Sequence, residues 1–165
     1  MTRRVEFVPL LLTETTDIFT IRLNGEDETE FHKFFILFKD TKDKYLKDDL
    51  DRIIAAIDKI ASNGALENYF RVEGKMKDRV CAIPLLISRR NVSEHGTLRL
   101  FCLRVSESLI IVGGGGLKLS RTYEQDDNLA SVVSLLQAVD EKLVELEKNG
   151  INLNEELEQI VVDID

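Results

Sequence analysis

The sequence predicts an α+β fold in which a mostly antiparallel sheet packs against helices. Runs rich in β-branched and aromatic residues occur in pairs around short polar turns, which is typical of β-hairpins. Other segments place apolar residues at three- and four-residue spacing, which indicates amphipathic helices. The resulting order of elements is β-β-α-α-β-β-β-β-α-α, and strands and helices that segregate in this way favour the α+β class.

The length and composition are those of one globular domain. The chain has 165 residues, of which 44% are apolar and 32% are charged, so it can bury a sizeable core. We expect a single domain over residues 1–165, with an N-terminal hairpin at 5–23, a core at 28–148 and a short tail helix at 154–162. No apolar run approaches the roughly 20 residues of a membrane-spanning helix, and we expect a cytoplasmic protein without a membrane contact.

The N-terminal hairpin consists of strands at 5–12 and 17–23 around a polar turn. Pro9 lacks a backbone donor, so the first strand is expected at an edge or to be broken. A helix is predicted over 29–38, where phenylalanines recur at helical spacing.

A second helix is the clearest element of the first half of the chain. Its apolar stripe is formed by Leu50, Ile53, Ile54, Ile57, Ile60 and Ala61. Asp48 or Asp49 is expected to cap its start, because aspartate accepts hydrogen bonds from the first free amides. Asn63 and Gly64 end it.

The second half begins with a strand at 79–83 and a long loop at 85–96. Two paired strands then turn at 106–108, and the four glycines at 113–116 are expected to interrupt the sheet before a last strand at 117–121. A long helix follows over 128–148, which Gly150 ends. The tail is predicted as a short helix.

The four consecutive glycines do not match a phosphate-binding loop. In a P-loop the last glycine is followed directly by Lys and Ser or Thr and then by a helix. Here Leu117 lies between Gly116 and Lys118, and the pattern that follows is a strand. A steric role is therefore favoured, in which glycine permits a tight turn or bulge and lets another backbone approach.

Charge is distributed unevenly along the chain. The net charge is −8, yet residues 71–123 carry a net charge of +6 and residues 124–165 a net charge of −10. One interpretation is a local basic surface for an anionic ligand; the other is a set of solvated ion pairs with the acidic helices. Proteins that bind nucleic acid non-specifically are usually basic overall, so a nucleic-acid site here has to be small, focused or presented in a larger assembly.

The cations of the late strands are the candidate binding residues. Arg99 and Arg104 are an odd number of residues apart on one strand and therefore point to opposite faces. Lys118 and Arg121 follow on the next strands, and Tyr123 comes after them. Such a group is suited to binding a phosphodiester and stabilising developing charge. The alternative is a solvated sheet face whose aliphatic stems cover the core.

Histidine and cysteine offer little further chemistry. His95 lies in the long loop beside the cations, where it is either a general base or an inert surface residue. No cluster of residues has metal-ligand spacing, so neither a metal nor another cofactor is expected. Cys81 and Cys102 stand in apolar strand contexts and are interpreted as reduced core residues.

The order of several short motifs resembles the RelE/HigB family of bacterial toxin–antitoxin toxins. A helical pair is followed by FRVEGK at 70–75, then by VCAIP, LRLFCLRV and LIIVGGGGLK, and last by a terminal helix. The likeness covers about residues 17–146. It implies a helical hairpin packed on one face of an antiparallel sheet, with C-terminal helices added beyond the usual end of the family.

The resemblance also implies an activity. Members of this family cleave messenger RNA, usually on the ribosome and without a metal, and a helix-turn-helix antitoxin neutralises them. By position, Arg99 or Arg104 and Lys118 neutralise the phosphate, Arg121 assists, and Tyr123 or His95 transfers a proton. Two alternatives remain: a non-catalytic protein-interaction module on the same scaffold, and a small-ligand or nucleotide pocket at the glycine run.

Overall fold

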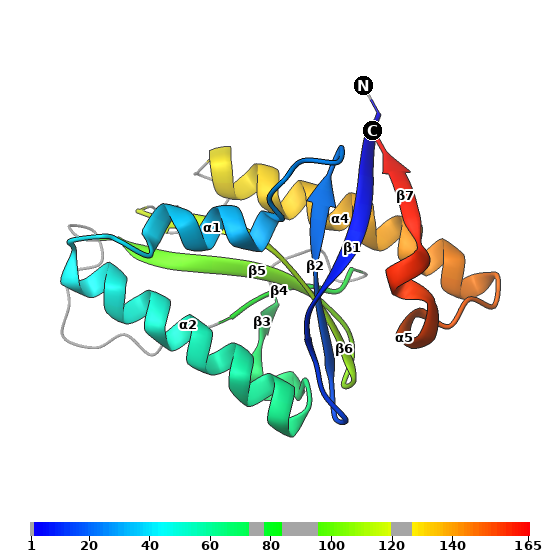
Figure 1. Ribbon diagram of the computed structural model, residues 1–165, viewed down its shortest axis with the longest axis horizontal. Helices are drawn as coiled ribbons and strands as arrows, with labels where there is room; N and C mark the ends of the chain where they lie inside the picture. Colours follow the sequence, from blue (N-terminus) through cyan, green and yellow to red (C-terminus); the bar gives the residue numbers. More distant parts are fainter. Residues whose placement is uncertain (1, 73–77, 84–95, 120–126) are drawn as a thin grey trace.

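The computed structural model describes residues 2–72, 78–83, 96–119 and 127–165 (Figure 1). Its strands are β1 (Arg3–Leu12), β2 (Asp17–Leu23), β3 (Arg71–Val72), β4 (Val80–Ala82), β5 (Thr97–Ser106), β6 (Leu109–Lys118) and β7 (Val161–Ile164). Its helices are α1 (Glu30–Phe38), α2 (Lys44–Asn63), α4 (Asp127–Lys148) and α5 (Leu153–Glu156), with short 3-10 helices η1 (Glu67–Tyr69) and η3 (Leu157–Gln159). The α+β class is confirmed. Within these ranges, no helix combines the length and the apolar character needed to cross a membrane.

The strands form one seven-stranded sheet in the order β3-β4-β5-β6-β2-β1-β7. The prediction of an antiparallel sheet is wrong at its centre, because β2 and β6 run parallel from Asp17 opposite Leu109 to Thr20 opposite Val112. Parallel neighbours need a long crossover connection, and here the chain between them forms α1, α2 and the other half of the sheet. Residue alternation along one strand carries no information about its neighbour's direction, so the sequence pattern did not show this.

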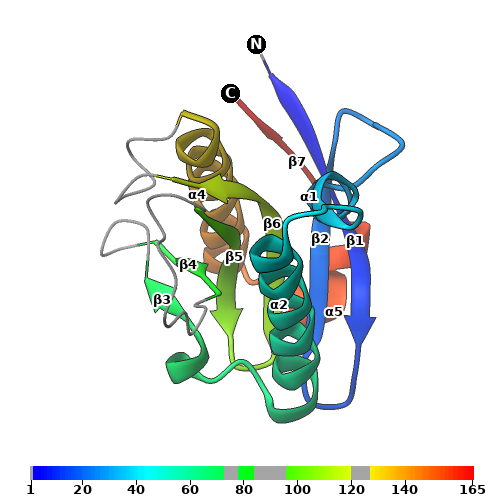
Figure 2. The same ribbon diagram turned by 90° about the vertical axis from the view of Figure 1, so that its left-hand side faces the viewer.

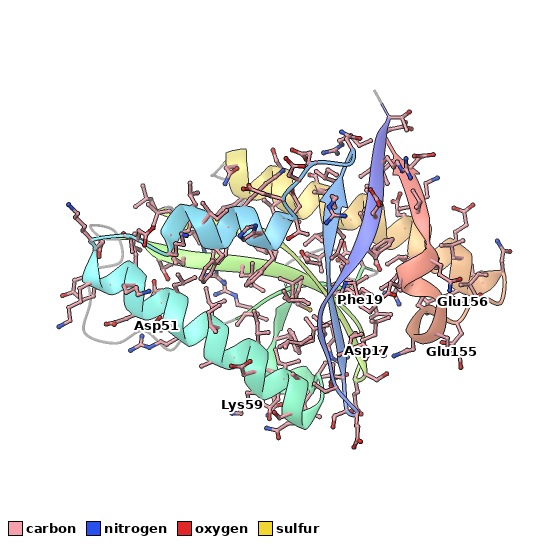
Figure 3. All side chains as sticks on the ribbon, viewed as in Figure 1. Asp17, Phe19, Asp51, Lys59, Glu155 and Glu156 are labelled. Carbon is pink, nitrogen blue, oxygen red and sulfur yellow. The ribbon has the colours of Figure 1, made fainter. Side chains whose placement is uncertain are left out.

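Helices cover both faces of the sheet (Figure 2). On one face α1 and α2 pack on side chains such as Leu100 and Ile110, as the predicted helical pair requires. On the other face α4 and α5 pack on a second core that includes Phe101 and Ile111. The outward face of α2 carries charged side chains, for example Asp51 and Lys59 (Figure 3).

The two N-terminal strands and α1 lie where the sequence predicted them, but the start of α2 does not. Asp43 is the cap of α2, since its Oδ1 accepts hydrogen bonds from the amides of Tyr45 (2.9 Å) and Leu46 (3.3 Å). The prediction that Asp48 or Asp49 caps this helix is therefore wrong. The apolar stripe also begins earlier than predicted, because Leu46, one turn before Leu50, is buried in the same core.

The four glycines do not interrupt the sheet, contrary to the prediction, because β6 continues through them to Lys118. Gly113 and Gly114 form a bulge opposite Phe101, between the register pairs Leu100–Gly115 and Cys102–Val112. A Cβ at Gly113 would lie 3.0 Å from Leu136 of α4. A Cβ at Gly115 would lie closer to the Arg99 carbonyl oxygen than van der Waals contact allows. The expected steric role of the glycines is thus confirmed: they let α4 and β5 approach the backbone of β6.

The C-terminal tail differs from the predicted helix at 154–162. After Gly150 (φ 90°) ends α4, the chain forms only the short α5 and η3, and residues 161–164 form β7. This strand pairs antiparallel with β1, from Arg3 opposite Ile164 to Glu6 opposite Val161. The β-branched run at 160–162 favours a strand, and its partner lies at the other end of the sequence.

Cys81 and Cys102 are free, buried and directly opposite each other in the β4–β5 register. Burial raises the pKa of the Cys102 thiol well above its ordinary value, and the nearby Cys81 raises it further. The thiolate is therefore scarce at neutral pH, which agrees with the expected role of both residues in the core.

The bulge yields a test with a matched control. Gly115→Ala should lower the free energy of unfolding by about 2 kcal/mol, because the added methyl group meets the Arg99 backbone and neither strand can withdraw cheaply. Gly114→Ala should cost less than about 0.5 kcal/mol, since the nearest atoms to its Cβ lie at 3.8 Å. Urea unfolding of both variants measures the difference, and equal stabilities would contradict the bulge geometry.

Candidate functional site

Two of the predicted cations, Arg99 and Lys118, lie side by side at one end of the β5–β6 hairpin. Lys118 is paired with Thr97, and Arg99 with Gly116. Directly opposed residues share a face of the sheet, so Arg99 and Lys118 are diagonal neighbours with Cβ atoms about 7 Å apart. Both lie on the face that α4 covers, and they are only 8% and 7% exposed.

The first turn of α4 lies directly above this hairpin end. A Cβ at Gly116, the partner of Arg99, would lie 2.9 Å from Nδ2 of Asn128 and 3.4 Å from the side chain of Leu129. The start of a helix carries the positive end of its dipole. Arg99, Lys118 and the start of α4 therefore meet at the end of the hairpin, and we call this place the hairpin-end site.

Arg104 does not belong to the hairpin-end site. It pairs with Ile110 on the α2 face, as the alternation predicted, and its Nε donates a 2.7 Å hydrogen bond to the Ala65 carbonyl. Its Nη1 is 4.0 Å from the Glu67 carboxylate. Arg104 thus holds the segment that follows α2 against β5, and the sheet separates its side chain from that of Lys118.

The remaining predicted residues, His95, Arg121 and Tyr123, lie outside the described part of the chain. His95 precedes Thr97 by two residues and Arg121 follows Lys118 by three, and Thr97 and Lys118 are register partners.

Asp49 is a residue that the sequence analysis misassigned. It is fully buried in α2, and its Oδ2 accepts hydrogen bonds from the Leu98 amide (3.1 Å) and the Thr97 hydroxyl (3.2 Å). The carboxylate therefore fixes the first residues of β5, where the hairpin-end site begins. The signal was present: Asp49 occupies the apolar stripe of α2, next to Leu50 and one turn before Ile53, where an unpaired charge is costly.

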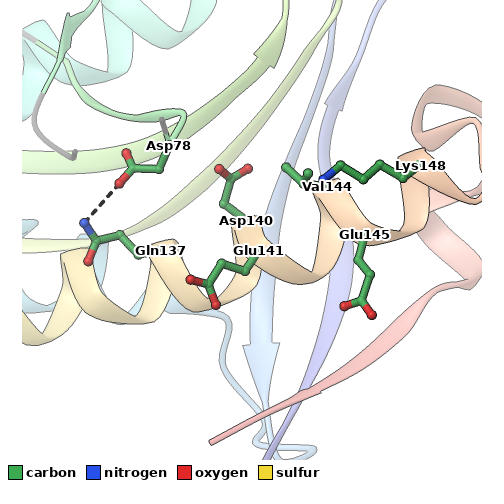
Figure 4. A pocket seen from close by; sticks show the side chains of 7 residues that line it. All are labelled: Asp78, Gln137, Asp140, Glu141, Val144, Glu145 and Lys148. Atoms are coloured by element: carbon green, nitrogen blue, oxygen red, sulfur yellow. Dashed lines mark hydrogen bonds between the residues drawn. The ribbon is translucent and has the colours of Figure 1, made fainter. Parts of the chain in front are cut away.

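A cavity of about 470 Å³ runs along α4 (Figure 4). It is lined by Asp78, Gln137, Asp140, Glu141, Val144, Glu145 and Lys148. Gln137 donates a 3.1 Å hydrogen bond to Asp78. Asp140 accepts from the Arg79 backbone amide (3.1 Å) and from Arg79 Nε (2.8 Å).

These contacts give the α4 cavity a structural role. Arg79 also contacts Glu147 at 2.9 Å. Burial lowers the pKa of Arg79, but the hydrogen bond to Glu147 and the charge of Asp140 outweigh this and raise it, so Arg79 stays cationic. The ion pairs clamp the start of β4 onto α4, and this explains a buried carboxylate at Asp140.

The hairpin-end site is suited to binding an anion. Guanidinium and ammonium groups on a rigid sheet neutralise phosphate, and a helix start adds a favourable field. Among the described residues, no group of three or more histidine, cysteine, aspartate or glutamate side chains could hold a metal ion. Comparisons with protein-family models, with curated proteins and with solved structures found no match for this chain.

Removal of the Asp140 carboxylate should destabilise the fold. Asp140→Asn leaves Arg79 without its buried partner, which should lower the free energy of unfolding by about 3 kcal/mol. Glu141→Gln, the exposed neighbour in the same helix, is the matched control and should change it by less than about 0.5 kcal/mol. Chemical denaturation measures both. A loss of similar size in the two variants would contradict the clamp.

Proposed function

We propose that the hairpin-end site binds an RNA phosphodiester, and that the chain is a metal-independent RNA endonuclease of the RelE/HigB toxin type. The observation that carries the proposal is that Arg99 and Lys118 are diagonal neighbours on one face of the hairpin, beneath the first turn of α4. The sequence motifs of the late hairpin add the resemblance to that family.

The proposed chemistry needs no group other than side chains and RNA. The ribose 2′-hydroxyl attacks the adjacent phosphorus in line, the P–O5′ bond breaks, and a 2′,3′-cyclic phosphate and a 5′-hydroxyl form. A base removes the 2′ proton and an acid protonates the leaving oxygen. Arg99 and Lys118 stabilise the charge that develops on the phosphoryl oxygens. His95, Tyr123 and Arg121 are the proposed proton-transfer and assisting residues.

The burial of the two cations constrains this proposal. Side chains exposed by only 8% and 7% contact RNA only after the groups that cover them move. The net charge of −8 also opposes extended contact with a polyanion. We therefore propose that the substrate is bound through few phosphates and is presented by a larger assembly, such as the ribosome.

Lys118→Met tests the proposed role of the ammonium group. In single-stranded RNA binding, the loss of one phosphate contact should reduce the slope of log K against log salt by about 0.7. The cleavage of cellular mRNA after induced expression, measured by primer extension, should fall about 100-fold or more. Lys118→Arg should retain most of the slope, because it keeps the charge.

Arg104→Gln is the control, since it removes a cation of the same hairpin from the opposite face. Its salt slope should equal that of the unaltered protein once melting curves show that it is folded. Normal growth and intact transcripts on expression of the unaltered protein would refute the endonuclease proposal.

A second candidate is a non-catalytic module that binds a protein partner, for which a helix-turn-helix antitoxin is the proposed example. It is favoured by the burial of Arg99 and Lys118 and by exposed apolar side chains such as Leu12 (57%) and Leu37 (69%). Co-purification with the product of the adjacent gene separates the two candidates. The module is supported if the complex still forms with Lys118→Met, is lost with Leu12→Asp, and no variant cleaves RNA.

A further inference from the structure

We propose that a second cavity, between α1, α2 and the β1–β2 hairpin, binds a small monocarboxylate with an apolar body, and that Arg22 is its anchor. This site goes beyond the proposed function, because it lies on a different set of elements from the hairpin-end site. The cavity measures about 440 Å³ and is lined by Leu10, Arg22, Asp27, Thr29, Phe31, His32, Phe35 and Ile54.

The walls of this cavity are largely apolar. Phe31 and Phe35 of α1 have stacked rings with centroids 6.5 Å apart, and Ile54 contributes the α2 side. Leu10 is the extra residue of a bulge in β1, between the register pairs Pro9–Phe19 and Leu11–Ile18. A bulge re-aims a side chain out of the regular alternation, and here it makes Leu10 part of the cavity. Volume and lining match those of small-molecule sites.

One cation in this cavity has an unused donor. Nε of Arg22 is buried and has no hydrogen-bond partner, and the described residues provide no ion pair for its guanidinium group. Glu6 lies opposite Arg22 in the β1–β2 register and Asp27 lines the cavity, yet neither forms a salt bridge with it. A guanidinium group without an ion pair at an apolar cavity favours an anionic ligand, and a carboxylate fits best, because guanidinium and carboxylate match in charge and geometry.

The surroundings of Arg22 select for a single negative charge. The positive end of α1 lies at the cavity and favours an anion. Two first-turn amides are already used, since Phe31 N donates to Thr20 (3.3 Å) and His32 N donates to Thr29 (3.2 Å). The main contribution of the helix to a ligand is therefore the field of its positive end. Asp27 opposes a second negative charge, which disfavours phosphate and dicarboxylates.

The test uses 3-phenylpropionate as the probe and its neutral analogue 3-phenylpropionamide as the control ligand, followed by NMR titration of the full chain. The acid should perturb the signals of Phe31, Phe35 and Ile54, and the amide should bind at least about tenfold more weakly, since it lacks the charge. Equal affinity for acid and amide, or perturbation confined to other residues, would overturn the proposal.

Two arginine variants complete the experiment. Arg22→Met should raise the Kd of the acid at least about tenfold while leaving that of the amide unchanged. Arg4→Met is the matched control. Arg4 lies two residues before Glu6 on β1 and therefore on the same face as Glu6 and its partner Arg22, but it does not line the cavity. Its Kd should be unaltered. If Arg22→Met does not fold, the acid-to-amide ratio and the shift map of the unaltered protein decide. No RNA is present, so the result is independent of the endonuclease proposal.

Discussion

The parallel pairing of β2 with β6 is the interaction on which the rest of the structure depends. Four register pairs, from Asp17–Leu109 to Thr20–Val112, join the two halves of the sheet. One half, β7-β1-β2, comes from the two ends of the sequence, and the other, β6-β5-β4-β3, comes from its middle. Buried side chains such as Ile18 and Ile110 on one face, and Phe19 and Ile111 on the other, link this seam to both helical layers. Its loss would separate the two halves.

The end of the β2–β6 pairing determines where the hairpin-end site and the Arg22 cavity lie. Beyond Val112, β6 pairs with β5 alone among the described strands, and the glycine bulge lets α4 pack on its backbone. That contact brings the start of α4 over Arg99 and Lys118. On the opposite face α1 is fastened to β2 through the Thr20 hydroxyl, and the space that remains between α1, α2 and the bulged strand β1 becomes the Arg22 cavity. Two bulges, one in β6 and one in β1, thus form two different surfaces.

The sequence contained most of the local structure but little of the long-range structure. Apolar periodicity located α2 and α4, and alternation correctly assigned Arg99 and Arg104 to opposite faces, because both signals depend on neighbouring residues. The direction of β6 against β2, the pairing of β7 with β1 and the position of Asp49 against β5 depend on contacts between distant segments. No local pattern encodes those, although a charge within an apolar stripe marked Asp49 as unusual.

For the candidate site, the sequence identified the right hairpin but could not show which cations meet. Lys118 and Arg99 become neighbours only through the register of β5 and β6, which the bulge at 113–116 shifts by one residue. The burial of both side chains depends on α4. Arg22 carried no sequence signal at all, since an arginine on a strand is ordinary and its unused donor becomes visible only when α1 is in place.

The pairing of β1 with β7 has a consequence for synthesis of the chain. The two ends of the molecule lie side by side (Figure 1), and Arg3 is in register with Ile164. At the usual rates of translation, roughly 8 to 30 seconds separate the appearance of these two segments at the ribosome. During that interval the outer edge of the first strand has no native neighbour, and an unprotected strand edge invites association with other nascent chains. Two features protect that edge until β7 has been synthesised. Pro9 cannot donate a hydrogen bond to a foreign strand, and Arg3 and Arg4 place positive charge on the edge.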